Sequence, residues 1–150
     1  MENVRASDPK RFKRGLTLTP RSRQLDTLML RVLNVLFAVA FLLATAVQYN
    51  DPDPYLWMPT YLAAFACCLA FMRGKLRPWV GYSIAGVALV WSFTLIPTVV
   101  SHPPPLADVF GDVKMYAPGV EEAREAGGLW LIALWVGTLA RVAQRGRLEA

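Results

Sequence analysis

The stretch Gln48-Tyr49-Asn50-Asp51-Pro52-Asp53-Pro54 separates two long apolar runs and decides how the chain folds. A residue before proline avoids the α-helical region, so Asp51 and Asp53 are predicted to be extended and the preceding helix to end by about Asn50. Proline suits the first turn of a helix, because its missing N–H is not needed there. Pro54 is therefore expected to begin the next helix, with Asp53 as its N-cap residue. The stretch predicts a tight turn between two helices.

Four apolar blocks make up most of the chain, at about residues 29–47, 55–72, 80–100 and 127–140. The 150 residues are 55% hydrophobic and only 18% charged, whereas an average soluble domain is about 25% charged. A membrane-spanning helix needs about 17–25 mostly apolar residues, a length that the first three blocks reach. The fourth block is short, so its helix must include neighbouring charged residues. We predict an all-α integral membrane four-helix bundle.

The breaks between the blocks predict the boundaries. Residues 1–24 are basic and lack hydrophobic periodicity, so they are expected to form a disordered cytoplasmic tail. A membrane domain follows over residues 25–145, and residues 146–150 form a second tail. The helices are expected at about 25–48, 54–73, 78–97 and 118–143. Ala44-Thr45-Ala46 also has the form of a signal-peptidase site, but the basic region before it is too long for a signal peptide.

Charge is distributed unequally between the two ends of the predicted helices. All but two of the 16 Lys and Arg residues fall at one end, the exceptions being Lys114 and Arg124. The acidic residues that fall at the other end are Asp51, Asp53, Asp108, Asp112, Glu121, Glu122 and Glu125. Cytoplasmic loops retain Lys and Arg, so both termini are expected to be cytoplasmic, in a bacterial inner membrane. The net charge of +5 thus reflects topology, and no nucleic-acid partner is predicted.

Three side chains in the apolar blocks are expected to have structural roles. Asn34 is an amide in the apolar part of the first helix, and such a group usually bonds to another helix. A substrate contact is the alternative for Asn34, because intramembrane polar groups also mark functional sites. Cys67 and Cys68 are expected to be small buried residues, which predicts neither a disulfide framework nor a metal site.

Other side chains predict how the second and third helices pack. Tyr55, Trp57 and Tyr61 are expected to be aromatic anchors at headgroup level. Small residues favour close helix packing. The predicted small-residue faces are Ala63, Ala64, Ala66 and Ala70 in the second helix and Gly81, Ala85 and Ala88 in the third. Because short turns flank the second helix, the first three helices are predicted to be antiparallel neighbours.

A second acidic group, Glu121-Glu122-Ala123-Arg124-Glu125, opens the fourth helix. At 1.5 Å per residue, Glu125 lies about 24 Å from Arg141, close to the outer membrane boundary. The helix dipole and an ion pair between Arg124 and Glu121 account for these acids structurally. A hydrogen-bonded site for Arg124 is a second alternative. In a third, Asp51 converges with Glu121 and Glu125, and their hard oxygen ligands hold Ca²⁺ or Mg²⁺.

These residues together resemble the transmembrane protein 220 family of small four-helix membrane proteins. The resemblance rests on Asn34, on residues 48–54 with Trp57 and Tyr61, and on residues 121–125 followed by Gly127-Gly128-Leu129. It covers about residues 30–142 and leaves out the basic N-terminal tail. The resemblance implies the four-helix membrane fold and no particular activity.

The sequence predicts a non-enzymatic protein without a cofactor. It has no Ser-His-Asp order, no Cys/His metal spacing, no phosphate-binding glycine loop and no pair of membrane histidines for haem, which leaves a membrane-embedded hydrolase with little support.

We expect a structural or accessory subunit that packs against lipid or a larger membrane complex, with homo-oligomerisation left open. Residues expected to have structural or interaction roles are Asn34, Gln48, Tyr49, Asn50, Asp51, Asp53, Trp57 and Arg124. Those expected to contact lipid or a partner are Lys10, Arg11, Lys13 and Arg14. The alternative function is an outer-face binding module that holds a divalent cation or a small cationic solute at Asp51, Glu121 and Glu125.

Overall fold

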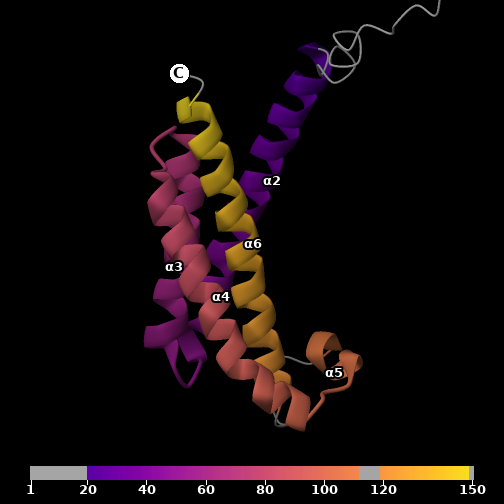
Figure 1. The fold of residues 1–150 in the computed structure, drawn as a ribbon. Helices are drawn as coiled ribbons and strands as arrows, with labels where there is room; N and C mark the ends of the chain where they lie inside the picture. Colours follow the sequence, from indigo (N-terminus) through magenta and orange to yellow (C-terminus); the bar gives the residue numbers. More distant parts are fainter. Residues whose placement is uncertain (1–19, 112–118, 149–150) are drawn as a thin grey trace, which may run out of the picture. The chain divides into compact units, whose positions relative to one another are not determined.

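The computed structural model describes residues 20–111 and 119–148, and the elements in these residues are all helical (Figure 1). Four long helices are present there: α2 (Pro20–Val47), α3 (Pro54–Met72), α4 (Pro78–Ser101) and α6 (Val120–Leu148). A 3-10 turn η2 (Gln48–Asn50) follows α2, and the short helix α5 (Leu106–Gly111) precedes α6. Each long helix contains a stretch long and apolar enough to cross a membrane. The predicted all-α fold with four membrane spans is confirmed.

The chain divides into two units, residues 1–33 and residues 34–150. In the first unit, residues 20–33 are the N-terminal part of α2, and their large apolar side chains Leu25, Leu28 and Met29 are exposed. The four basic residues predicted to contact lipid or a partner, Lys10, Arg11, Lys13 and Arg14, lie outside the described residues. The packing described below belongs to the second unit.

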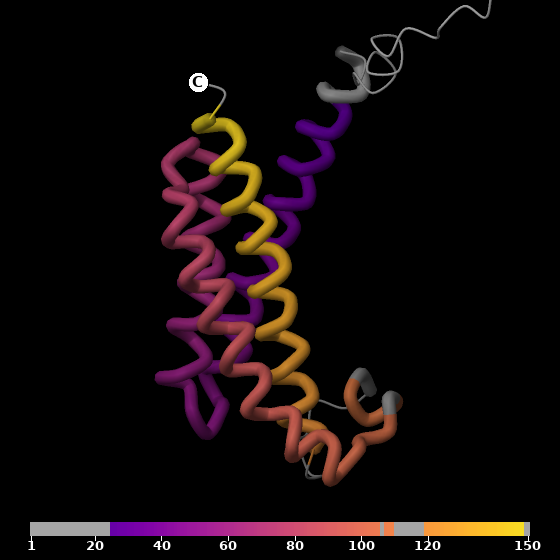
Figure 2. The backbone as a smooth tube through the Cα atoms, in the orientation of Figure 1, coloured from indigo at the N-terminus to yellow at the C-terminus, as the bar shows by residue number. Residues whose placement is uncertain are grey.

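Helix α6 supplies the centre of the core in the second unit. Its fully buried side chains are Leu129, Ile132, Val136, Leu139 and Ala140. They recur at intervals of three and four residues, which places them on one face of the helix. Helix α4 packs against α6 over much of its length, while α3 and α5 meet α6 over shorter stretches (Figure 2).

The face of α4 that meets α6 consists of small residues. Gly81, Ala85, Ala88 and Ser92 are buried on it. A Cβ atom at Gly81 would lie 2.8 Å from the Cβ atom of Ala140 and 3.5 Å from the carbonyl oxygen of Val136. Small residues let membrane helices approach closely, and here glycine is required for that approach. The small-residue face predicted for the third helix is confirmed.

The small-residue face predicted for the second helix is only partly correct. Ala64 is buried, but Ala66 is exposed, and Ala63 and Ala70 are only half-buried. Besides Ala64, the buried small residues of α3 are Cys67 and Cys68, and both cysteines are free. Ala64 and Cys68 are four residues apart and therefore lie on the same side of the helix, which is its inward face.

Two of the predicted aromatic anchors also face inward. Trp57 is only 3% exposed and stacks on Trp91, with their ring centroids 4.7 Å apart. Tyr61, four residues later on the same side of α3, is half-buried. Tyr55 points outward and is exposed, as an anchor requires. An aromatic ring near the end of a span is therefore not sufficient to predict an anchor, because the same ring also serves as core.

Helices α3 and α4 are in contact, as predicted for neighbours, but they pack loosely. Although residues 73–77 alone connect them, the two helices approach each other much less than α4 approaches α6. The connection is a Schellman motif, in which Lys75 N–H donates to Ala70 O (2.8 Å) and Gly74 N–H donates to Phe71 O (2.9 Å). Gly74 has the positive φ of +66° that this motif requires. Since α6 covers the small face of α4, α3 meets α4 across larger side chains.

Three helix ends differ from the predicted positions. Helix α2 begins at Pro20, within the stretch predicted to be a disordered tail, because proline fits a first helical turn. Helix α4 continues through Pro97 to Ser101, since helices that span membranes tolerate an internal proline. Helix α6 extends to Leu148, because Arg and Gln near its end are good helix formers.

Candidate functional site at the acidic end

Asn34 joins three helices inside the second unit. It is fully buried, and its Nδ2 donates to the backbone oxygen of Cys68 on α3 (3.0 Å). Its Oδ1 accepts a hydrogen bond from Nε1 of Trp135 on α6 (3.3 Å). Phe37, one turn later on α2, stacks on the Trp135 ring with centroids 4.2 Å apart. The predicted bond from Asn34 to another helix is confirmed, and both ends of the amide take part in packing.

The turn after η2 is organised by its two carboxylates. Asp51 is extended, as predicted, with φ −72° and ψ 150°. Its Oδ1 accepts a hydrogen bond from the backbone N–H of Asp53 (3.0 Å), which is an Asx-type turn. Asp51 therefore stabilises the turn locally, in addition to being a member of the acidic cluster.

Asp53 occupies the N-cap position of α3, but its side chain does not cap the helix. Its Oδ1 accepts a hydrogen bond from the Tyr55 hydroxyl instead (2.7 Å). The backbone of Asp53 (φ −122°, ψ 53°) also departs from the extended geometry usual for a capping residue. Its predicted position is confirmed, and its predicted extended geometry and capping bond are wrong.

The other polar residues of the turn face away from the core. Tyr49 is 75% exposed, Asn50 is exposed and Gln48 is half-buried. The hydrogen bonds found among the described residues include none from these three side chains. They form a polar surface beside the turn.

The start of α6 is fixed by a glycine and a glutamate. Gly119 has φ +88°, and its backbone packs directly against the carbonyl oxygen of His102, so a Cβ atom has no room there. Its N–H donates to Oε2 of Glu122 (2.9 Å), which is one half of a capping box. Glu122 therefore stabilises the N-terminus of α6. His102 is exposed and is the C-cap residue of α4.

Arg124 connects α6 to the short helix α5. Its Nε donates to Val109 O (2.9 Å) and its Nη2 donates to Asp108 O (2.8 Å). A cation beside helix carbonyls near a C-terminus satisfies acceptors that have no intrahelical partner. Arg124 therefore anchors α5 to the first turns of α6 through backbone oxygens of α5. Asp112, Lys114 and Met115 of the same connection lie outside the described residues.

The predicted acidic cluster is partly assembled. Asp51 and Glu121 are close enough for their charges to act on Glu125. Asp51 and Glu125 in turn act on the hydroxyl of Tyr61. Within residues 20–111 and 119–148, however, no three His, Cys, Asp or Glu side chains are grouped closely enough to hold a metal ion. We call the surface formed by Asp51, Asp53, Glu121, Glu122 and Glu125 the acidic end.

Tyr61 and Gly128 form a contact that the sequence does not predict. The Tyr61 hydroxyl packs directly against the backbone of Gly128, where a Cβ atom would overlap it. This contact brings α3 and α6 together just below the acidic end. The signal in the sequence is the four-residue spacing of Trp57 and Tyr61, which places both rings on one helix face.

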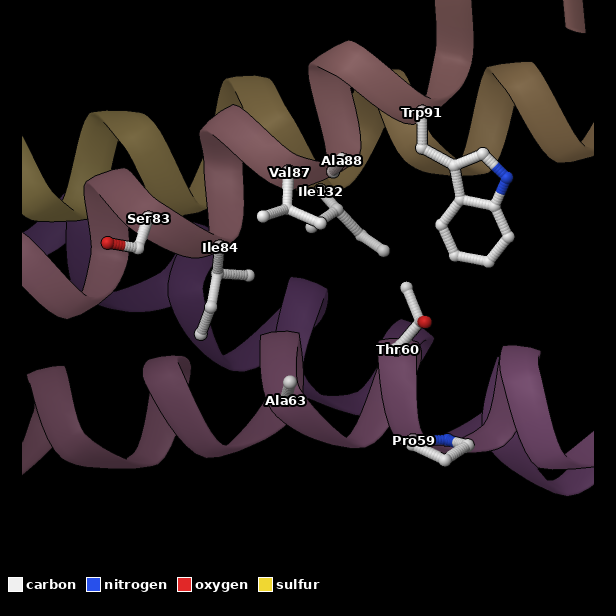
Figure 3. Close-up of a pocket in the computed structure, with 9 residues that line it drawn as sticks. All are labelled: Pro59, Thr60, Ala63, Ser83, Ile84, Val87, Ala88, Trp91 and Ile132. Carbon is white, nitrogen blue, oxygen red and sulfur yellow. The ribbon is translucent and has the colours of Figure 1, made fainter. Parts of the chain in front are cut away.

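A cavity of about 310 Å³ lies between α3 and α4 (Figure 3). Helix α3 lines it with Thr60 and Ala63, and α4 lines it with Val87 and Trp91, among others. Ile132 of α6 forms part of its inner wall. Nothing in the periodicity of the sequence predicts this cavity, because it depends on how far α3 and α4 diverge.

The family comparison covers most of these features. A family model described as "Transmembrane family 220, helix" matches residues 40–141. The match includes the turn at 48–54, Trp57, Tyr61 and the segment 121–129, whereas Asn34 precedes it. No curated protein and no solved structure matches the chain. Because the match extends over more than half of its residues, the chain belongs to transmembrane family 220.

Proposed function

We propose that this multi-pass membrane protein is a non-enzymatic accessory subunit that packs against a larger membrane complex. One observation carries the proposal: among the described residues, every buried polar side-chain atom has a hydrogen-bond partner. Asn34 bonds to other helices, and Thr45 and Ser92 donate to carbonyl oxygens of their own helices. Polar groups that serve transport or chemistry in a membrane face a cavity or a substrate path. Here they serve packing.

Helix α2 offers the surface for such a partner. In the second unit it buries a single face, made of Asn34, Ala38, Phe41 and Thr45. Five large apolar side chains on its other faces are 47–61% exposed: Val35, Leu36, Val39, Leu42 and Leu43. Association of membrane helices depends on close packing of such surfaces. We infer that this face of α2 meets the partner.

The proposed orientation has the termini and the 73–77 turn in the cytoplasm. Arg73, Lys75 and Arg77 lie in the turn between α3 and α4, and Arg147 of α6 donates to Leu76 O in that turn (3.4 Å). The turn and the end of α6 are therefore on the same side of the membrane, opposite the acidic end. Retention of basic residues in the cytoplasm supports this orientation. Labelling of single cysteines with a membrane-impermeant maleimide tests this orientation. In a cysteine-free background, we expect Asn50→Cys to react in intact cells and Lys75→Cys to react only after lysis. The bacterial inner membrane stays part of the proposal.

Site-specific photo-crosslinking tests the accessory role. A photoreactive phenylalanine analogue at Leu36 or Leu43 is expected to give an adduct with a different protein in native membranes, identified by mass spectrometry. The matched control is the same analogue at Phe41, which is buried on the opposite face and is expected to crosslink only within the chain. Adducts with lipid alone at both exposed positions would contradict the accessory role. Adducts with a second copy would indicate a homo-oligomer.

A second candidate function rests on the acidic end. Asp51, Glu121 and Glu125 together give this end a negative charge that would attract a divalent cation or a small cationic solute, although they are not grouped closely enough to form a metal-ion cage by themselves. We expect such binding to raise the melting temperature of the purified protein in Ca²⁺ or Mg²⁺, and Glu125→Gln to abolish the increase. A melting temperature that does not depend on either cation would exclude this function.

A further inference from the structure

The second unit has an end whose described charges are all basic. The basic end consists of Arg73, Lys75, Arg77, Arg141, Arg145 and Arg147, all of them exposed. The described acidic residues of this unit lie elsewhere, at the acidic end and in α5. The basic end is therefore complementary to an anion at the membrane surface, and juxtamembrane Lys and Arg residues attract anionic lipids.

A hollow opens at the basic end between the α3–α4 turn and α6. Its volume is about 240 Å³, and its walls include Gly74 and Leu76 of the turn and Gly146 and Arg147 of α6. Two glycines leave backbone groups accessible, and Arg147 supplies a guanidinium that suits a phosphate group. Basic pockets between membrane helices are sites for anionic headgroups.

The cavity between α3 and α4 lies within reach of this end. Along α4, Ser83 and Trp91 lie about 9 and 21 Å beyond Arg77 at 1.5 Å per residue. One leaflet contributes about 15 Å of hydrocarbon. The cavity thus begins inside the leaflet of the basic end and reaches just past the middle of the membrane. An acyl chain anchored at the basic end extends to this depth.

The shape of the cavity decides what fills it. Val87 at its mouth is 66% exposed, whereas Ala88 and Ile132 in its wall are buried, so the cavity opens sideways to the surroundings of the helices (Figure 3). Its 310 Å³ extends over about 12 Å of helix, which corresponds to a cross-section of roughly 26 Å². A helix is about 10 Å wide and needs a cross-section of about 80 Å². A cavity this narrow suits a hydrocarbon chain better than a partner helix.

We propose that the α3–α4 cavity holds one acyl chain of an anionic phospholipid whose phosphate lies at the basic end. The turn that joins α3 to α4 carries three of the basic side chains, so these two helices supply the acyl site and part of the headgroup site, which Gly146 and Arg147 of α6 complete. The bound lipid fills the space that α3 and α4 leave between them. This inference is independent of the accessory role, because α2 is the surface proposed for the protein partner.

Native mass spectrometry of the purified full chain tests the proposal. The protein in mild detergent is incubated with dioleoyl phosphatidylglycerol or, in parallel, with dioleoyl phosphatidylcholine, which has the same chains and no net charge. We expect one retained phosphatidylglycerol, at least fivefold more abundant than retained phosphatidylcholine. Equal retention of the two lipids would overturn the proposal.

Two sets of variants separate the headgroup from the acyl chain. Removing the charges of the turn in the Arg73→Gln/Lys75→Gln/Arg77→Gln variant is expected to lower phosphatidylglycerol retention to the phosphatidylcholine level. Ala63→Leu fills the cavity and is expected to reduce retention of both lipids. If Ala63→Leu fails to fold, Ser83→Leu fills the same cavity and is expected to have the same effect. Gly86→Leu is the matched control, because no atom lies near that position and it does not line the cavity. Retention that is unchanged in the charge variant or in the cavity variants would overturn the proposal.

Discussion

Helix α4 meets its two neighbours in opposite ways. Toward α6 it presents Gly81, Ala85, Ala88 and Ser92, and the two backbones come so close that a Cβ atom at Gly81 does not fit. Toward α3 it presents larger side chains such as Ile84 and Trp91, and a cavity remains between the helices. Proximity in sequence favours α3, which is joined to α4 by a short turn. Close packing between membrane helices follows small residues and not short connections.

The largest effect is expected from enlarging a residue in the tight interface. Gly81→Leu forces α4 and α6 apart and is expected to lower the free energy of unfolding by about 3 kcal/mol. Gly86→Leu is the control on the same helix, because a side chain there meets open space. Unfolding in SDS, followed by circular dichroism, measures both. Similar losses for the two variants would show that glycine matters here for the helix itself and not for the interface.

The next effect is expected from Asn34, which connects the same core to α2 and α3. Asn34→Leu leaves the Trp135 indole N–H buried without its acceptor and is expected to cost about 2 kcal/mol of unfolding free energy. Trp135→Phe in the same background removes the unpaired donor, so the double variant is expected to lose less than the sum of the single variants. A strictly additive double-mutant cycle would contradict the hydrogen bond.

A smaller effect is expected where α3 touches α6. Gly128→Ala places a methyl group against the Tyr61 hydroxyl, which can shift at the end of its side chain, so the expected loss is about 1 kcal/mol. Tyr61→Phe removes the obstructing oxygen and is expected to relieve most of that loss. The matched control is Gly127→Ala, since no neighbouring atom meets a side chain at that position. If Gly127→Ala is equally harmful, the contact with Tyr61 is not the cause.

The smallest effect is expected on the open side of α4. Ala63→Leu adds three carbon atoms to the cavity between α3 and α4, and in the absence of added lipid it is expected to raise stability by about 0.5 kcal/mol. The same unfolding measurement applies. A loss comparable to that of Gly81→Leu would show that α3 and α4 close on each other in solution and that the contrast between the two sides of α4 does not exist.

The spans could be predicted from the sequence because length and hydropathy alone define them. The small face of α4 was also predictable, since Gly81, Ala85 and Ala88 recur at helical spacing. The face of α3 was not, because alanines and cysteines alternate around that helix and composition does not show which side meets α6. Trp57 was misplaced for the same reason: a ring near the end of a span suits the headgroup region or the core, and only its stacking on Trp91 decides.

The residues of the candidate site could be predicted from the sequence, but the hydrogen bonds that they make could not. The sequence places Asp51, Glu121 and Glu125 at one end of the helices, and in the structure the turn after η2 and the start of α6 lie at the same end. The bonds that Arg124 makes to α5 depend on how a connection far from it in sequence folds back. The Asp53–Tyr55 bond replaces a predicted cap because a phenol two residues away competes for the carboxylate.

The position of α6 after the other three long helices has a consequence for biogenesis. The fully buried apolar core belongs largely to this helix, which leaves the ribosome after α2, α3 and α4. Until Val120–Leu148 is synthesised, the small face of α4 has nothing to pack against and Tyr61 of α3 lacks its contact with Gly128. The first three helices therefore enter the membrane as an incomplete intermediate. A nascent chain that stops before α6 presents that uncovered face to the quality-control machinery of the membrane.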